Sequence, residues 1–124
     1  MLKNSSGIVM KAYNKCINIG QLTLENRVVL PPMASQTADE NGFVTEKTLE
    51  HYARLCQSQT SLVMAEYSFI HLGGRSEKNQ LGVSSEAHIE GLSKLNAVIK
   101  DSGAASALQI CSCRRKILSR PHRW

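Results

Sequence analysis

Aromatic residues and prolines are scarce in this chain, and acidic residues are missing after Ile110. Only 5% of its 124 residues are aromatic and three are proline, so aromatic platforms on which nucleic-acid bases stack are scarce. It has no apolar run of the ~18 residues that indicate a membrane span, and Met1 to Met10 carry no sustained apolar segment typical of a secretory signal. We therefore expect a cytoplasmic protein without a membrane partner.

The four cysteines are too few for a disulfide framework and fit reduced thiols in such a compartment. Cys16 and Cys56 are interpreted as small buried hydrophobic residues. Cys111 and Cys113, with His122, could be considered as a metal site. Structural zinc takes four ligands and usually a wider spacing of the paired ligands, so we predict no metal site.

The net charge of +5 is unevenly distributed. Residues 1–110 hold ten basic and ten acidic residues, so the whole excess comes from the last segment, through Arg114, Arg115, Lys116, Arg120 and Arg123. Such a tail, with Trp124, could contact phosphates and stack on a base. The alternative is a solvated basic tail, and on that interpretation we predict no specific nucleic-acid partner.

The segment from Asn26 to Ser35 is central to the fold prediction. Its apolar residues Val28 to Leu30 are followed by Pro31 and Pro32, and prolines fix their own φ and push the preceding residue toward an extended geometry. The pattern predicts a buried strand that ends in a rigid turn able to hold a flat ligand. An edge strand stopped by prolines is the alternative. Residues 17–29, which alternate around Gly20, predict a β-hairpin leading into this strand.

Two helices and two further strands follow. Thr45 is a candidate N-cap for a helix whose apolar face repeats every three or four residues through Leu49, Tyr52, Ala53 and Cys56. Ser84 or Ser85 can cap a second helix, with an apolar face formed by Ile89, Leu92, Leu95 and Ile99. Residues 61–66 and 105–110 predict buried strands, residues 35–44 and 71–80 predict loops, and His88 is expected at the surface.

The order of elements is therefore hairpin, strand, helix, strand, helix, strand. Alternating strands and helices of these lengths predict an α/β domain with a parallel sheet built by right-handed crossovers. A doubly wound sheet and a (β/α)8 barrel both begin in this way, so the pattern leaves the two open.

Several linked motifs resemble the Old Yellow Enzyme family of FMN-dependent NAD(P)H:flavin oxidoreductases, over about residues 13–110. They occur in the family's order and spacing: Ile19 to Arg27, Pro31-Pro32-Met33, Ala65-Glu66-Tyr67, Gly74-Arg75 followed by Gln80-Leu81-Gly82, and Ala107 to Ile110. The resemblance implies the N-terminal portion of a (β/α)8 TIM barrel, a hairpin plus about three β/α units, with FMN bound at the C-terminal mouth.

The resemblance also implies which residues contact the cofactor. Pro32, Met33 and Ala34 would lie along the isoalloxazine, and the Gln109 amide would hydrogen-bond its pyrimidine edge, to which it offers both a donor and an acceptor. Tyr67 occupies a position beside the flavin that is usually small. Ala34 replaces a Thr or Cys found in many relatives, so it cannot bond the flavin and tune its potential. NAD(P)H would be the reductant, and activated alkenes the substrate class.

After Ile110 the family continues with His-Ala-Gly, whereas this chain has Cys111-Ser112-Cys113. Codons for Ser112 to Lys116 can be written so that loss of one base restores His-Ala-Gly-Gly, and we hypothesise a reading-frame shift near Cys111. The expected division is a frayed segment 1–12, a partial barrel 13–110 and a non-family basic tail 111–124. A complete barrel takes about 250 residues, so we expect a truncated, inactive chain without assigned catalytic residues, or a non-enzymatic remnant. The oligomeric state is left open.

Overall fold

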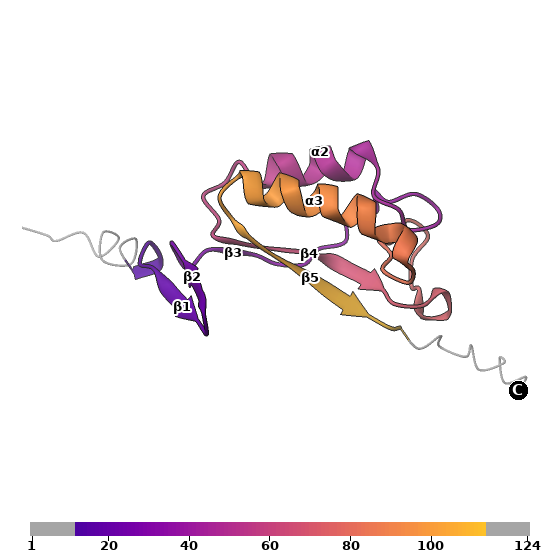
Figure 1. Cartoon of the computed structure of the whole chain (residues 1–124), viewed down its shortest axis with the longest axis horizontal. Helices are drawn as coiled ribbons and strands as arrows, with labels where there is room; N and C mark the ends of the chain where they lie inside the picture. The colour runs from indigo at the N-terminus through magenta and orange to yellow at the C-terminus, as the bar shows by residue number, and fades with distance from the viewer. Residues whose placement is uncertain (1–11, 114–124) are drawn as a thin grey trace, which may run out of the picture.

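The computed structural model describes residues 12–113 and arranges them as a small hairpin and an α/β unit (Figure 1). The antiparallel hairpin consists of β1 (Ile17–Ile19) and β2 (Leu22–Leu24), and the parallel sheet of β3 (Val29–Leu30), β4 (Leu62–Phe69) and β5 (Ala105–Cys111). The helices are α2 (Glu46–Leu55) and α3 (Ile89–Asp101), with 3-10 turns η1 (Leu72–Gly74) and η2 (Glu86–His88). The predictions for residues 1–11 and 114–124, including His122 and Trp124, lie outside the described residues.

The strand order resolves the choice between a doubly wound sheet and a barrel. The sheet runs β3-β4-β5, so consecutive strands are neighbours, and both helices lie on the same face of it (Figure 1). A doubly wound sheet carries helices on both faces and reverses its strand order, whereas a barrel adds strands in sequence with all helices outside. The described unit therefore has the organisation of a barrel segment.

The first strand is shorter and more exposed than predicted. β3 contains two residues, and Val29 is 41% exposed. Val29 pairs with Leu62 and Leu30 with Val63, so successive residues of β3 alternate between the helix-covered face and the open face. The prediction of a buried strand is wrong for this reason, although the strand itself exists. β2 ends at Leu24, which leaves a short connection between the hairpin and β3.

Helix α2 begins where the sequence predicts. Thr45 is the N-cap, and its hydroxyl accepts a hydrogen bond from the backbone N–H of Thr48, while the Thr48 hydroxyl accepts one from the N–H of Thr45. This reciprocal capping satisfies two backbone donors that the first turn would otherwise leave unpaired. On the covered side, α2 and α3 pack on the sheet around a core of Ala38, Tyr52, Cys56, Val63, Ala65, Leu81, Leu95, Ile99 and Ala104.

The start of α3 differs from the prediction in two ways. The chain enters this helix through η2, and Ile89 is 59% exposed rather than part of the apolar face. His88 is 5% exposed, so its predicted surface position is wrong. Its ring stacks on Phe43 at 4.4 Å between centroids, and its Nδ1 lies 3.0 Å from the Ser85 hydroxyl. The 3-10 turn directs His88 inward and leaves Ile89 outside.

The exposure of β5 and Cys16 also departs from the predictions. β5 was expected to be buried, but Leu108 is 37% and Ile110 63% exposed, because among residues 12–113 this strand has a neighbour on one side only. Cys56 is buried as predicted, whereas Cys16 is exposed because it precedes the hairpin, outside the helix-covered core. Within residues 12–113, no helix combines the length and apolar character that crossing a membrane requires.

Candidate functional site

The predicted site residues belong to one edge of the parallel sheet. Pro32, Met33 and Ala34 follow the end of β3, Tyr67 lies near the end of β4, and Gln109 lies near the end of β5. Because the three strands are parallel and adjacent, their C-terminal ends meet at the same edge. The fold therefore brings three separate stretches of sequence to the position where α/β proteins place their ligand sites.

A β-bulge distinguishes this edge from the rest of the sheet. Ala65 pairs with Leu108 and Ser68 pairs with Ile110, so Glu66 and Tyr67 together oppose the single residue Gln109. Such a bulge locally interrupts the ladder and re-aims side chains, and bulges are over-represented beside active sites. Two of the residues predicted to contact the flavin, Tyr67 and Gln109, are thus brought opposite each other by the irregularity.

Three of the site residues are accessible to a ligand. Met33 is 56% exposed, and Ala34 and Gln109 are also exposed, while Pro32 and Tyr67 are half-buried. The Gln109 side chain has no hydrogen-bond partner within residues 12–113, so its amide is available as both donor and acceptor. Both helices lie on one face of the sheet and leave the ends of its strands uncovered by helix (Figure 1). This edge offers a stiff, partly apolar turn and a free amide, which suits a flat heterocycle.

Tyr67 is fixed by a carboxylate from the loop after β4. Its hydroxyl donates to Glu77 at 2.8 Å, and Gln36 Nε2 donates to the same carboxylate at 2.6 Å. The Tyr67 bond, followed by the Gln36 bond, lowers the pKa of Glu77 below its usual value, and the same bond to Glu77 is the main cause that raises the pKa of Tyr67. Gln36 adopts a φ of 53°, a conformation unusual for a residue other than glycine. The loops after β3 and β4 are therefore joined beside Tyr67.

Sequence reasoning missed Gln36, Glu77 and the role of Glu66. Glu66 is 1% exposed, and its carboxylate accepts hydrogen bonds from the backbone N–H and the hydroxyl of Ser35. A charged residue within an apolar run was the available signal, because a buried carboxylate requires hydrogen-bond partners. Gln36 and Glu77 lie in segments predicted only as loops, where spacing gives no indication of which side chains meet.

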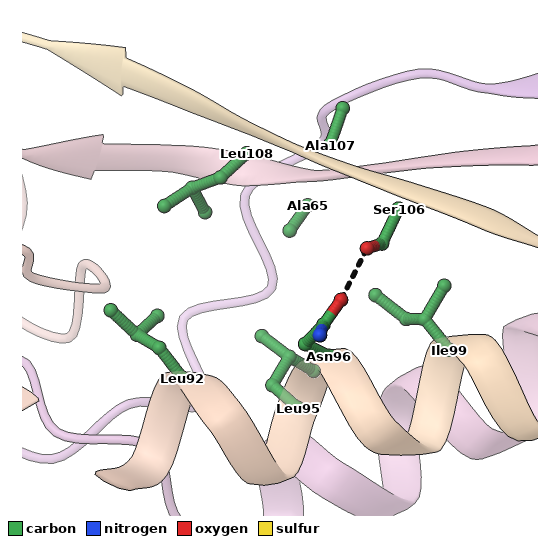
Figure 2. Close-up of a pocket in the computed structure, with 8 residues that line it drawn as sticks. All are labelled: Ala65, Leu92, Leu95, Asn96, Ile99, Ser106, Ala107 and Leu108. Carbon is green, nitrogen blue, oxygen red and sulfur yellow. Dashed lines mark hydrogen bonds between the residues drawn. The ribbon is translucent and has the colours of Figure 1, made fainter. Parts of the chain in front are cut away.

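A hollow on the helix side of the sheet takes no part in this site. It is an apolar groove of about 280 Å³ between α3 and β5, shown in Figure 2, and is lined by Ala65, Leu92, Leu95, Asn96, Ile99, Ser106, Ala107 and Leu108. Asn96 and Ser106 are hydrogen-bonded to each other across it. None of the predicted site residues lines it. Within the described range 12–113, no three His, Cys, Asp or Glu side chains gather as metal ligands.

Sequential parallel strands, helices on one face and a ligand-accessible edge at the strand ends define the class of protein as a segment of a (β/α)8 barrel with a site at its C-terminal mouth. The chain belongs to the NADH:flavin oxidoreductase / NADH oxidase family, which it matches over residues 14–120. The resemblance to the Old Yellow Enzymes is thereby confirmed, and with it the family's association with FMN and NAD(P)H.

Individual relatives agree with this assignment. The NADPH dehydrogenase of Bacillus cytotoxicus is 36% identical over 99 residues, which cover 79% of this chain and 29% of the relative. A 2-naphthoyl-CoA reductase structure has a TM-score of 0.78 and 27% identity over 81% of this chain and 15% of that one. The Old Yellow Enzyme homologue from Zymomonas mobilis shares the fold, with a TM-score of 0.74 at 23% identity, over 82% and 28%. This chain spans less than a third of these relatives.

Proposed function

We propose that residues 13–110 form the flavin-contacting first part of an FMN-dependent NAD(P)H oxidoreductase. Pro32, Met33 and Ala34 would lie along the isoalloxazine, Tyr67 beside it, and Gln109 would hydrogen-bond its pyrimidine edge. The observation that supports this most directly is that the ends of β3, β4 and β5 bring these five residues to one edge of the sheet.

The chemistry of these residues fits the cofactor. The turn after β3 presents apolar and backbone surface stiffened by two prolines. The amide of Gln109, which has no partner among residues 12–113, matches a heterocycle edge with alternating donors and acceptors. Ala34 offers no hydroxyl or thiol to the ring, so this chain would hold the ring there by contact alone. When bound, FMN supplies the hydride chemistry, while the residues of this chain orient the ring.

The substrate and reductant are part of the proposal. We infer a small-molecule substrate of the activated-alkene class, with NAD(P)H as reductant. The 2-naphthoyl-CoA complex of one structural relative is a small-molecule complex of that protein. No residue here is assigned a proton-transfer role, and a barrel of this kind takes about 250 residues. We therefore propose that these 124 residues do not catalyse turnover by themselves and that the complete activity belongs to a full barrel.

The reading-frame shift near Cys111 and a cytoplasmic location also remain proposals. The family match extends to residue 120, ten residues beyond the proposed end of the barrel segment at Ile110. Sequencing the coding DNA from Leu108 to Lys116 tests the shift directly. An open alternative frame that continues with family sequence would support it, and an unchanged tail without such a frame would contradict it.

Flavin titration tests the proposed site. FMN fluorescence should be quenched saturably by the chain, and Gln109→Leu should weaken binding about tenfold, as expected when a ligand loses hydrogen bonds worth about 1.4 kcal/mol. Gln57→Leu, an exposed glutamine at the opposite end of the fold, is the matched control and should bind like the native chain. Absence of saturable binding, or equal weakening by both variants, would contradict the assignment.

Turnover is measured on the same preparations. We expect the purified chain to be colourless and the absorbance of NAD(P)H to be stable after FMN is added. A yellow preparation with stoichiometric FMN and oxidation of NAD(P)H would overturn the proposal that this chain is inactive.

A further inference from the structure

Glu66 carries a buried carboxylate with no cation beside it in the described part of the chain. It is 1% exposed, and the ion pair found within residues 12–113 joins Lys94 and Glu90 on the outer surface of α3. Burying a carboxylate is costly unless hydrogen bonds replace its hydration. Glu66 lies in the bulge of β4, opposite Gln109, and its carboxylate therefore depends on hydrogen bonds from neighbouring residues.

Both carboxylate oxygens of Glu66 bind the same residue of the loop after β3. Oε2 accepts the backbone N–H of Ser35 at 2.9 Å, and Oε1 accepts the Ser35 hydroxyl at 2.5 Å. Hydrogen bonds to an ionised acceptor are roughly twice as strong as neutral ones. Two such bonds from one residue fix the direction as well as the distance of the backbone at Ser35.

Ser35 is in turn connected to the start of α2 by a series of hydroxyl groups. Its hydroxyl oxygen accepts the backbone N–H of Thr37 at 3.3 Å, and the Thr37 hydroxyl donates to Thr48 at 3.1 Å. The Thr45 hydroxyl donates to the Thr37 carbonyl at 2.7 Å. Thr45 and Thr48 are the residues that cap α2, so the loop is attached to β4 at Ser35 and to the helix two residues later.

Glu66 is itself held on the opposite side. Its backbone N–H donates to the Tyr52 hydroxyl at 2.8 Å, and its carbonyl accepts the Ser68 hydroxyl at 3.0 Å. Tyr52 is 2% exposed and belongs to the core cluster, and Ser68 is fully buried. The carboxylate is therefore presented from a rigid part of the fold toward a loop that would otherwise have few fixed points.

We propose that Glu66 is a positioning residue for the cofactor site: its carboxylate holds Ser35 and thereby fixes the preceding turn of Pro32, Met33 and Ala34 against the flavin. This inference rests on the proposed function. Glu66 acts through Ser35, the residue to which its side chain is hydrogen-bonded within residues 12–113. The β4 bulge explains how one strand supplies both Tyr67 at the site and the carboxylate that stabilises the neighbouring turn.

Amide hydrogen exchange measured by NMR on the whole chain tests the holding of the turn without any cofactor. Glu66→Gln keeps the shape but offers only one acceptor oxygen, and it should raise the exchange rate of the Ser35 amide about 10- to 100-fold, the effect of losing a charge-assisted hydrogen bond. Ser35→Ala should give a smaller increase, and Ser35→Thr should restore protection, because it returns the hydroxyl. Val63, in the fully buried part of β4, should exchange as in the native chain.

Ser61→Ala is the matched control. Ser61 is a buried residue directly before β4, at the opposite end of that strand from Glu66, and its hydroxyl donates to the Asn26 carbonyl at 2.7 Å. It should lower global stability without selectively exposing Ser35. If Ser35 exchange is unchanged in Glu66→Gln, or rises equally at Ser35 and Val63, Glu66 does not hold the turn and the inference is wrong. Should Glu66→Gln fail to fold, the Ser35→Ala and Ser35→Thr pair gives the same decision.

FMN titration separates this inference from the proposed function. Glu66→Gln should weaken FMN about tenfold, a change that equals about 1.4 kcal/mol, whereas Ser61→Ala should leave affinity unchanged. If the Ser35 amide exchanges faster in Glu66→Gln but FMN affinity is unchanged, Glu66 does not act on the cofactor site. The proposed function is still decided by Gln109→Leu. If the native chain binds no FMN, the proposed function fails, and with it the assignment of the turn as a flavin contact.

Discussion

β4 and β5 are neighbouring strands with similarly apolar sequences, yet their environments differ sharply. In β4, Val63 and Phe69 are fully buried, whereas in β5 Leu108 is 37% and Ile110 63% exposed. β4 has a paired strand on each side, while β5 has a partner on one side only within residues 12–113. An apolar run therefore predicted both strands, but the number of neighbours decided which of them is buried.

The largest test of this comparison is the loss of Phe69. Phe69→Ala should lower the free energy of unfolding by about 3–5 kcal/mol, because it removes a fully buried ring and leaves a cavity. Ile110→Ala, on the exposed neighbouring strand, should change it by less than about 0.5 kcal/mol. Urea denaturation followed by circular dichroism measures both values. Similar losses in the two variants would show that β4 and β5 are equally covered in solution.

The next test adds atoms beside the end of β4 instead of removing them. A Cβ at Gly82 would lie 2.7 Å from Phe69 Cζ and 2.8 Å from His88 Nε2, and both rings are packed in the interior. Gly82→Ala should therefore cost about 1–3 kcal/mol by overpacking. Gly103→Ala meets no atom within 4 Å but has a φ of 87°, so it should cost only the backbone strain, about 1 kcal/mol. A Gly82→Ala variant as stable as the native chain would contradict tight packing at this end of β4.

A third test concerns the bulge, in which two residues of β4 oppose one residue of β5. Tyr52→Phe removes the acceptor of the Glu66 N–H and should cost about 1–2 kcal/mol, because a buried donor is left unpaired. Tyr67→Phe removes a bond to Glu77 at a half-buried position, and we expect a smaller loss. Urea denaturation compares the two. A larger loss of stability for Tyr67→Phe would show that the bond to the loop residue Glu77 stabilises the fold more than the bond within the bulge.

Alkaline pH should lower the free energy of unfolding through the phenol groups of Tyr52 and Tyr67, which bind Glu66 and lie on β4 respectively. Burial raises the pKa of Tyr52, and the hydrogen bond to Glu77 raises that of Tyr67. The folded state therefore keeps both protons after the unfolded state has begun to lose them, so stability is complete below the unfolded pKa and falls as pH rises above it. We expect a loss of about 1 kcal/mol by pH ~11, smaller in Tyr52→Phe. Urea midpoints that stay constant between pH ~8 and pH ~11 would contradict these pKa shifts.

Much of the fold could be predicted from local signals. The N-cap at Thr45, the apolar repeat through Tyr52 and Cys56, and the strands at 61–66 and 105–110 depend on nearby residues, and the structure contains all of them. The predictions that were wrong concern residues whose burial depends on neighbouring elements. Val29 is exposed because its face of the sheet carries no helix, and His88 is buried because Phe43 and Phe69, distant in sequence, lie beside it.

The candidate site was predictable by resemblance but its supports were not. Pro32, Met33, Ala34, Tyr67 and Gln109 were assigned from motifs that the family shares, and the fold brings them to one edge. Their flavin contacts remain predictions. The bulge that places both Glu66 and Tyr67 opposite Gln109 has no local sequence signature, because it arises from the pairing of two strands. The same is true of the bonds from Ser35 to Glu66 and from Gln36 to Glu77.

The smallest expected effect comes from placing a charge on the exposed strand. Ile110→Lys should change the free energy of unfolding by less than about 0.5 kcal/mol, since the side chain is already 63% exposed. Lysine on an unpaired edge opposes strand addition by another chain, so light scattering at high protein concentration should decrease. Ser68, the register partner of Ile110 on β4, is fully buried, and Ser68→Lys should prevent folding because it buries an unpaired charge. If Ile110→Lys were instead as damaging as Ser68→Lys, β5 would be covered in solution, as a strand inside a closed barrel is.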